Sequence, residues 1–421
     1  MSLGNDGKVG IVEFNLSEKF SIINAAQIVT LETVLETNKI NEESLGLIEE
    51  GAIVVENGRV AWVGSMLDYD RLFSNKSITS INAEGKTVTP GFVDPHTHTV
   101  FAGTRETELD RKIAGQNYMD ILKAGGGILQ TIKETREASR DKIFNESRSR
   151  VKQLIMNGVT TLEIKTGYGQ SLKDELKLLS IIEMLTHSEK IDIVPTFLGL
   201  HTVPPEFQKA SDYVDYVIRD VLPLVSQSKM KPQFSDCFCE KNIFEADLCE
   251  KYLRASAYYG MRTKVHADEF LESGGAELAA KLGCVSADHL ENSTREGLAE
   301  MAKSGVVAVL LPGTAFCSQI DPPDLKTIID AGCQIALGTD ICPNSWVESP
   351  QISMSIACNL MKLNSAHALV AATFGGALAL GRPDVGRLVP GSLADIVIHG
   401  FPNYRFIPCK IGGHHVNRVY K

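Results

Sequence analysis

Eight short apolar segments, each followed by a longer amphipathic stretch, occupy the chain between residues 88 and 384. Apolar runs of strand length that alternate with helix-period segments, such as 171–187 and 243–259, predict parallel strands joined by helices. The eight expected strands are 87–94, 159–165, 191–199, 232–238, 262–266, 284–288, 306–311 and 334–338. Eight such units in succession predict an α/β protein whose sheet closes into a (β/α)8 TIM barrel.

Both ends of the chain carry short strands without intervening helices. The runs before the barrel are 19–24, 51–56, 59–64 and 77–82, and Asn57-Gly58 between two of them is a strong hairpin signal. Two further runs, 391–398 and 416–420, follow the barrel. Since neither end has enough strands to enclose a core, we expect residues 1–87 and 385–421 to form one small β-sandwich beside the barrel at 88–384.

Composition limits the partners of this chain. Its 421 residues are 43% hydrophobic and 22% charged, which is typical of a soluble globular protein. The net charge of −10, without a basic block, argues against nucleic acid as a partner. No apolar run reaches the roughly 18 residues of a membrane span. An anionic ligand would therefore need a local cation.

The cysteines and the N-terminus indicate the compartment. The nine cysteines are scattered and include no Cys-x-x-Cys pair, which fits reduced thiols better than a disulfide framework. Cys237 and Cys239 are expected to pack in a strand. The opening residues lack the apolar core of a secretory signal. We therefore expect a cytoplasmic protein.

The segment Asp94-Pro95-His96-Thr97-His98 ends the first apolar run. In an extended strand, residues two apart point to the same side, so His96 and His98 are expected to converge. Neutral imidazole is a ligand for both zinc and iron. Two unrelated histidines near a turn are the alternative interpretation.

Further polar residues follow other predicted strands, which favours the metal interpretation. Barrel enzymes keep their chemistry at the carboxyl ends of the strands. The residues found there are His201, Glu240, His266, Asp288, His289 and Asp340. His96, His98, His266 and Asp340 would supply three imidazoles and a carboxylate to one ion, zinc or iron. His289 would reach the metal or its water, unless it is a core histidine, and Asp340 would otherwise be a helix N-cap.

Several longer motifs carry a family resemblance. They are the segments 90–98, 101–105, 163–169, 196–201, 265–269 and 287–291, together with the aspartate after the eighth strand. On these motifs the chain resembles the amidohydrolase superfamily and, within it, the imidazolonepropionases, over nearly its whole length. The resemblance implies hydrolysis of 4-imidazolone-5-propanoate, a small anionic molecule, to N-formimino-glutamate. It also implies one zinc or iron(III) ion and a homodimer.

The loop after the eighth strand departs from the family pattern. Where the family usually has Asn and Gly, this chain has Cys342 and Asn344, followed by Ser345. Because this loop helps to hold the substrate in the family, contacts of these three residues with the substrate are expected but altered. Asp340 itself is retained.

Residue chemistry adds candidates for substrate binding. Arg105 can grip a carboxylate with two parallel hydrogen bonds, although a solvated surface Arg is the alternative. Tyr168 lies between two glycines that let the backbone approach a ligand, or simply in a glycine-rich turn. His201 could donate to the propanoate or to a ring carbonyl. Glu269 could accept from a ring N–H, or pair with a surface Lys.

The expected mechanism follows from the ion. A bound metal lowers the pKa of water toward about 7. Either Asp340 or Glu269 would carry the proton to the leaving nitrogen, and His289, with the metal, would stabilise the oxyanion. The fourth strand ends at Glu240, with Lys241 beyond it, so it lacks the lysine that bridges two ions in other superfamily members. One ion is therefore favoured.

Two other functions remain open at this point. The same ligands would suit an aminohydrolase that deaminates a purine or pyrimidine heterocycle. A non-catalytic scaffold of the same fold is less favoured, because such relatives typically lose metal ligands.

Overall fold

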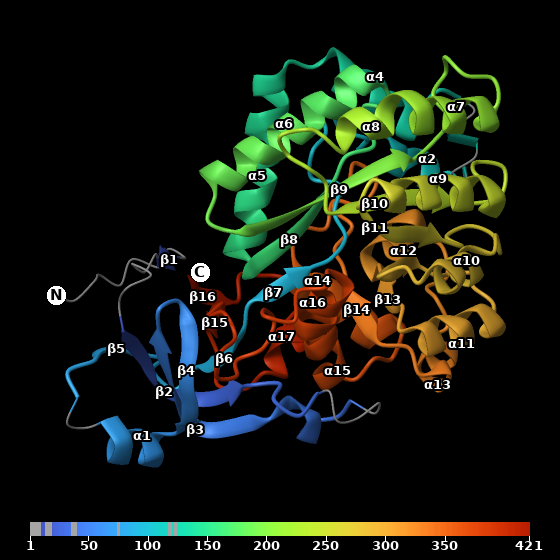
Figure 1. Ribbon diagram of the computed structural model, residues 1–421. Coiled ribbons are helices and arrows are strands. Elements are labelled where there is room, and N and C mark those ends of the chain that lie inside the picture. Colours follow the sequence, from blue (N-terminus) through green and yellow to red (C-terminus); the bar gives the residue numbers. More distant parts are fainter. Residues whose placement is uncertain (1–9, 13–18, 35–39, 74–75, 117–119, 122–123) are drawn as a thin grey trace.

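The computed structural model describes residues 10–12, 19–34, 40–73, 76–116, 120–121 and 124–421, which form a barrel with a smaller sheet beside it (Figure 1). All neighbouring barrel strands pair in parallel and follow one another in sequence order. They are β7 (Phe92–Asp94), β8 (Val159–Lys165), β9 (Asp192–Leu200), β10 (Phe234–Cys239), β11 (Arg262–Ala267), β12 (Ser286–His289), β13 (Val307–Leu310) and β14 (Ile335–Leu337). The predicted (β/α)8 barrel is confirmed.

Hydrogen bonds beyond the strand ends join the first and the last strand of the barrel. The Asp94 carboxylate accepts from the backbone N–H of Thr339 at 3.1 Å and from its hydroxyl at 2.6 Å. The backbone N–H of Asp340 donates to the carbonyl of His96, and that of His98 to the carbonyl of Ile341, both at 3.0 Å. This closure holds the segments after β7 and β14 side by side.

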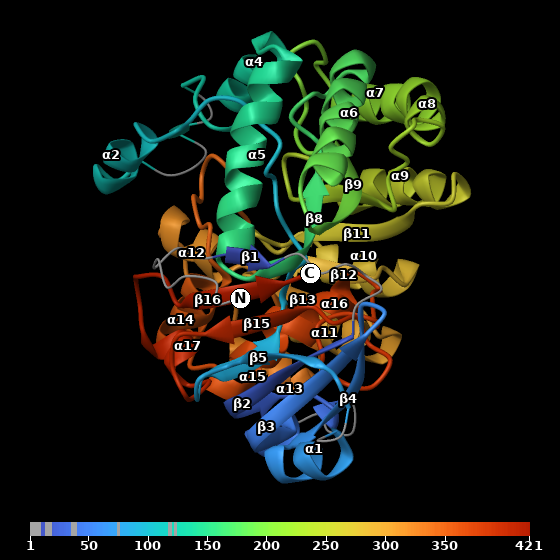
Figure 2. The same ribbon diagram turned by 90° about the vertical axis from the view of Figure 1, so that its left-hand side faces the viewer.

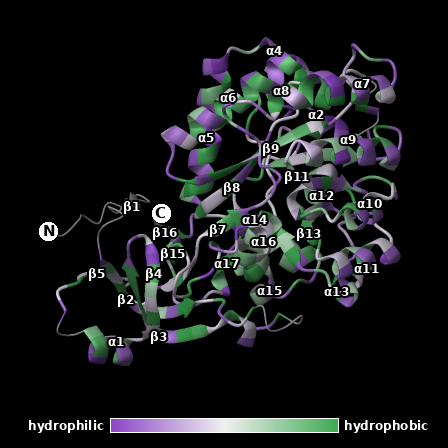
Figure 3. Cartoon of the chain, viewed as in Figure 1, coloured by the Kyte–Doolittle hydropathy of each residue, from purple (hydrophilic) through white to green (hydrophobic). Residues whose placement is uncertain are grey.

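Helices surround the barrel, and the longer ones, such as α5, α6 and α9, carry both hydrophobic and hydrophilic residues, as expected when one face packs on the strands (Figure 3). In α6, Ser171 caps the first turn by accepting from the Asp174 N–H, while Leu179 and Ile182 are buried. This α6 matches the prediction over 171–187. The helices are α2 (Glu108–Ile113), α4 (Ile128–Glu137), α5 (Arg140–Met156), α6 (Leu172–Ser188), α7 (Ala210–Tyr216), α8 (Leu222–Val225), α9 (Ala246–Tyr258), α10 (Gly275–Leu282), α11 (Arg295–Ser304), α12 (Pro312–Ser318), α13 (Leu325–Ala331), α14 (Pro350–Leu360), α15 (Ser365–Val370), α16 (Gly376–Ala379) and α17 (Phe406–Cys409). Among the described residues, no helix is both long and apolar enough to cross a membrane.

The apolar run 87–94 is two strands rather than one, so the prediction of a single barrel strand is wrong. Its first part, β6 (Thr87–Pro90), pairs with β2 and β15 in the small sheet, and only β7 belongs to the barrel. Gly91 separates them, where a Cβ would come within 2.2 Å of the Thr160 hydroxyl. Hydrophobicity marks the run as buried but does not say which sheet buries it.

The small sheet is built from both ends of the chain, as predicted, and its strands face the viewer in Figure 2. Its strands are β1 (Gly10–Val12), β2 (Phe20–Val29), β3 (Leu47–Glu56), β4 (Arg59–Ser65), β5 (Thr79–Asn82), β6, β15 (Ile396–His399) and β16 (Val416–Tyr420), with α1 (Met66–Phe73) after β4. The β3–β4 hairpin turns at Asn57 and Gly58, whose φ angles of 54° and 69° suit this pair. Ile22, Ile53 and Ile396 pack together in the hydrophobic core of the small sheet. The domain limits at residues 88 and 384 stay predictions.

Candidate metal centre and substrate pocket

His96 and His98 lie in the segment after β7, beyond the end of the strand. Their convergence therefore results from the closing hydrogen bonds to Asp340 and Ile341, rather than from strand alternation. Both side chains are buried. The structure places them beside His266 at the end of β11 and Asp340 after β14.

The nitrogen and oxygen atoms of these four side chains lie close together. Asp340 Oδ1 is 3.4 Å from His98 Nε2 and 3.5 Å from His96 Nε2. His266 Nε2 is 3.4 Å from His98 Nε2. One group of possible metal ligands comprises His96, His98 and Asp340, and a second shares His96 and adds His266 and His289. The four residues proposed from the sequence are thus together, with His289 at similar range.

Carboxylates below the histidines fix their orientation. His96 Nδ1 lies 2.6 Å from Asp288 Oδ2, and His266 Nδ1 lies 3.0 Å from Asp236 Oδ2. A carboxylate at Nδ1 holds the imidazole proton there and directs the Nε2 lone pair away from it. The Nε2 atoms of His96 and His266 are therefore turned toward the other ligand atoms.

The converging imidazole nitrogens and the Asp340 oxygen would be stabilised by a cation between them. Burial lowers the pKa of His96 and His98 well below the usual value, so both rings are neutral. His96 Nε2 and Asp340 Oδ1 are buried and have no hydrogen-bond partner among the described residues. Imidazole lone pairs that converge with a carboxylate oxygen, without a shared proton, repel unless a cation lies between them. The donor set suits zinc or iron.

Backbone strain marks two residues of this centre. His289 has φ = 79° and Asp340 has φ = 48°, in the left-handed region that residues with a side chain seldom adopt. Strain of this kind is usually found at functional sites, where the surrounding structure maintains it. Thr314 further holds Asp340, because its hydroxyl donates to Asp340 Oδ2 at 2.5 Å. The second oxygen, Oδ1, is left facing the histidines.

A buried ionic cluster fills the barrel interior beneath the centre, and the sequence analysis missed it. Lys165 Nζ lies 2.7 Å from Asp236 Oδ2 and 2.8 Å from Glu163 Oε2, and all three side chains are fully buried. Although burial opposes it, Asp236, Glu163 and Asp288 raise the pKa of Lys165 above its usual value. The ammonium group is therefore retained, and it compensates the carboxylate that orients His266.

A second buried lysine supports the other side of the cluster. Lys264 Nζ donates to the carbonyl of Pro95 at 2.8 Å and lies 3.2 Å from Glu163 Oε1. It is also 3.8 Å from Asp288 Oδ2, the partner of His96. Alternating apolar patterns do not predict a lysine inside a barrel. The signals available in the sequence were Glu163 and Lys165 within the strand 159–165 and Lys264 within the strand 262–266.

A cavity of about 60 Å³ opens above the metal centre. It is lined by most of the residues predicted to bind substrate, together with several metal-centre side chains, namely His98, Arg105, Tyr168, His201, His266, Glu269, His289, Asp340, Cys342 and Asn344. Ser345 is buried but is not among the residues lining this cavity, and its backbone N–H donates to the Cys342 carbonyl at 3.2 Å. The structure therefore gives Ser345 a place in the turn rather than on the cavity wall.

Arg105 and Tyr168 are held on the cavity wall by carboxylates behind them. The Arg105 guanidinium donates to Glu108 Oε2 at 2.7 Å, and both side chains are almost fully buried. Glu175 accepts from the backbone N–H groups of Gly169 and Gln170 at 2.9 and 2.7 Å, which fixes the loop that carries Tyr168. Burial lowers the pKa of His201, whose ring lies 5.0 Å from that of Tyr168, to about 3.

Glu269 lines the same cavity and lies in an acidic environment. Its Oε2 is 3.8 Å from His289 Nε2, and Glu291 Oε2 is 3.7 Å from His289 Nδ1. Burial, followed by the charges of Glu291 and Asp340, raises the pKa of Glu269 well above its usual value. Glu269 therefore holds a proton where an ordinary carboxyl group would have lost it.

Comparison with known proteins decides the family. The model of the amidohydrolase family matches residues 87–406. The chain is 44% identical to the imidazolonepropionase of Geobacillus kaustophilus over 94% of its length and 95% of that protein's length. The imidazolonepropionase of Parabacteroides distasonis is 41% identical, with 96% of this chain and 98% of that protein covered. The chain belongs to the imidazolonepropionases of the amidohydrolase family.

Solved structures of other enzymes share the fold of this imidazolonepropionase family member. A triazine hydrolase variant superimposes with a TM-score of 0.75 at 17% identity, covering 94% of this chain and 92% of that one. A zinc-bound adenosine deaminase from Xanthomonas campestris gives 0.69 at 17% identity, covering 97% and 92%. At this identity the likeness concerns the fold alone. The protein is a hydrolase of this family with a candidate metal centre.

Proposed function

We propose that the protein hydrolyses the cyclic amide of 4-imidazolone-5-propanoate to give N-formimino-L-glutamate, a step of histidine degradation. The observation that carries this proposal is one cavity lined both by the candidate metal ligands and by Arg105. The first group suits hydrolysis of a carbonyl, and the second suits the propanoate carboxylate. Membership of the imidazolonepropionases supports the same substrate.

The metal would be held by His96, His98, His266 and Asp340. We propose a single zinc or iron(III) ion, because three neutral imidazoles and one carboxylate complete the protein's share of such a centre. When bound, such an ion lowers the pKa of a water molecule and polarises a carbonyl group. The carboxylates of Asp288 and Asp236 keep two of the imidazoles turned toward it.

The remaining steps belong to the side chains around the cavity. Arg105 binds the propanoate, and Tyr168 and His201 orient the ring with their polar atoms. Asp340 accepts a proton from the attacking water, and His289 stabilises the negative charge that develops on the carbonyl oxygen. Glu269, whose pKa is raised by burial and by the charges of Glu291 and Asp340, donates its proton to the leaving ring nitrogen as the C–N bond breaks. Cys342 and Asn344 shape the wall beside the substrate.

A spectrophotometric assay of the purified protein tests this function. We expect consumption of imidazolonepropanoate, seen as loss of its ultraviolet absorbance, and no ammonia release from purines or pyrimidines. Ammonia from one of those heterocycles, with imidazolonepropanoate unchanged, would replace the proposal with a deaminase. The homodimer and the cytoplasmic location expected from the sequence stay predictions.

Replacing Arg105 by methionine should weaken substrate binding much more than turnover. A charge-assisted hydrogen bond contributes about 1.5–3 kcal/mol, so KM should rise by roughly 10- to 100-fold while kcat changes little. Arg111→Met is the matched control, since Arg111 lies on the same helix α2 and bonds to Gln116 at 2.7 Å. Steady-state kinetics of both variants would refute an anionic contact at Arg105 if their KM values were equal.

A further inference from the structure

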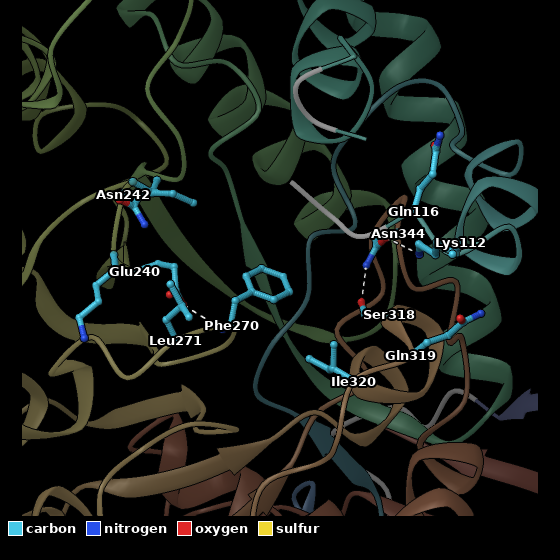
Figure 4. A pocket seen from close by; sticks show the side chains of 13 residues that line it. Lys112, Gln116, Glu240, Asn242, Phe270, Leu271, Ser318, Gln319, Ile320 and Asn344 are labelled. Carbon is cyan, nitrogen blue, oxygen red and sulfur yellow. Dashed lines mark hydrogen bonds between the residues drawn. The ribbon is translucent and has the colours of Figure 1, made fainter. Parts of the chain in front are cut away.

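A second, larger cavity of about 570 Å³ lies outside the substrate cavity at the same end of the barrel (Figure 4). The two cavities share Phe270 and Asn344. The inner cavity is the smaller of the two, at about 60 Å³. Phe270 and Asn344, which line both cavities, place the outer cavity directly beside the substrate cavity.

Lys112 lines the outer cavity together with Asn344, and neutral groups hold its ammonium in place. Its ammonium donates to Asn344 Oδ1 at 2.7 Å and to the carbonyl of Cys317 at 3.2 Å. Asn344 Nδ2 in turn donates to the hydroxyl of Ser318 at 2.9 Å, which fixes the amide (Figure 4). Asn344 thus acts as a bridge between α2, which carries Lys112, and the end of α12.

The charge of Lys112 is not neutralised by an ion pair. Within the described part of the chain, no carboxylate lies within 4.0 Å of its ammonium. Burial, and then the charge of Arg105, lowers the pKa of Lys112, so two cationic groups act on the same region. The Glu108 carboxylate pairs directly with Arg105. Two cations with one close anion leave a local positive charge in an acidic protein.

We propose that Lys112, held by Asn344, is a second cationic contact for the substrate carboxylate, and that the outer cavity is an entry site for small carboxylates. This inference rests on the proposed function, because it concerns the propanoate of the same substrate. The carboxylate meets Lys112 first and passes to Arg105 as the ring enters the inner cavity. Lys112 therefore contributes to capture of the substrate and not to cleavage of the C–N bond.

Steady-state kinetics of Lys112 and Asn344 variants test the proposal. Lys112→Met should raise KM about 10-fold and leave kcat within about two-fold, and Lys112→Arg should restore most of the loss. Asn344→Gly removes the acceptor for Lys112 and should raise KM in the same direction. The double variant should be no worse than Lys112→Met alone, because both changes act through one ammonium.

Lys241 provides the matched control, since it is an exposed lysine that lines the same outer cavity and whose side chain forms no hydrogen bond with Asn344, both residues being among those that the structure describes. Lys241→Met should change KM by less than about two-fold, because a solvated charge acts weakly. An unchanged KM in Lys112→Met would overturn the proposal. So would an equal change in Lys241→Met, which would indicate a diffuse field rather than a contact.

A binding measurement separates this proposal from the proposed function. Glutarate, a small dicarboxylate, should slow the acetylation of Lys112 relative to Lys241 in the unmodified protein, as followed by mass spectrometry. Absence of this protection would overturn the entry site even if imidazolonepropanoate is hydrolysed. Protection in a protein that does not hydrolyse imidazolonepropanoate would retain the carboxylate site and reject the substrate assignment.

Discussion

Replacing Lys165 by methionine should lower the free energy of unfolding by about 3–5 kcal/mol, because the change leaves buried carboxylates without their cation. Lys165 lies within 3.0 Å of both Asp236 and Glu163, and none of the three side chains is exposed. Urea unfolding of the chelated protein gives this value without a contribution from bound metal. The same variant should bind zinc about 10- to 100-fold more weakly, since Asp236 would no longer hold His266 in place.

A control variant and a double variant test whether the loss of stability in Lys165→Met arises from the buried cluster. Lys142→Met removes an exposed lysine that lies 3.9 Å from Glu146, and it should cost less than about 1 kcal/mol. Adding Glu163→Gln to Lys165→Met should recover part of the lost stability, because it removes one of the uncompensated charges. If Lys165→Met kept both its stability and its zinc affinity, the buried cluster would not be what positions the metal ligands.

Replacing Glu269 by glutamine should lower kcat by about 10²- to 10⁴-fold, the range of a lost general acid. Glutamine keeps the size and the hydrogen-bonding ability of the side chain but has no proton to transfer. Burial and the charges of Glu291 and Asp340 raise the pKa of Glu269, so Glu269 keeps its proton to a higher pH than an ordinary carboxyl group and loses it as the pH rises through that pKa. We therefore expect kcat to fall on the alkaline side, and this fall should be absent in Glu269→Gln.

Glu291→Gln is the matched control for Glu269. Glu291 is also buried beside His289, and its pKa is raised by burial and by the charges of Asp340, Glu240 and Asp268, but it does not line the cavity. The alkaline fall should persist in Glu291→Gln, with a smaller loss of kcat. Near-normal kcat and an unchanged pH profile in Glu269→Gln would instead assign the proton transfer to Asp340.

The fold could be predicted well because barrel strands are strongly apolar and regularly spaced. The β8 strand spans the predicted 159–165, and the Asn57-Gly58 hairpin is found where predicted. The run 87–94 was predicted as one strand and is two, because a buried run looks the same in either sheet. Only the glycine at position 91 marked the point where the chain leaves one sheet for the other.

The candidate metal ligands could be predicted from the sequence, but the buried residues that hold them in place could be predicted less well. His96, His98, His266 and Asp340 were recognisable as candidate ligands because each lies at or just after the end of a barrel strand, and barrel closure brings strand ends together. Ser345, expected to contact the substrate, lies in a turn with Cys342, and its contact with the substrate stays a prediction. The roles of Lys165 and Lys264 were not predicted because they depend largely on carboxylates from other strands, Asp236 and Asp288 for Lys165 and Glu163 and Asp288 for Lys264. Such pairing is a property of the folded barrel and not of local sequence.

Metal content measured together with turnover tests the central claim most directly. Elemental analysis of the purified protein should find one zinc or iron ion per chain, and chelation should remove the ion and the hydrolysis of imidazolonepropanoate together. One equivalent of metal should restore both, whereas a His266→Ala variant should retain neither. Full turnover by protein that has lost its metal would contradict the account.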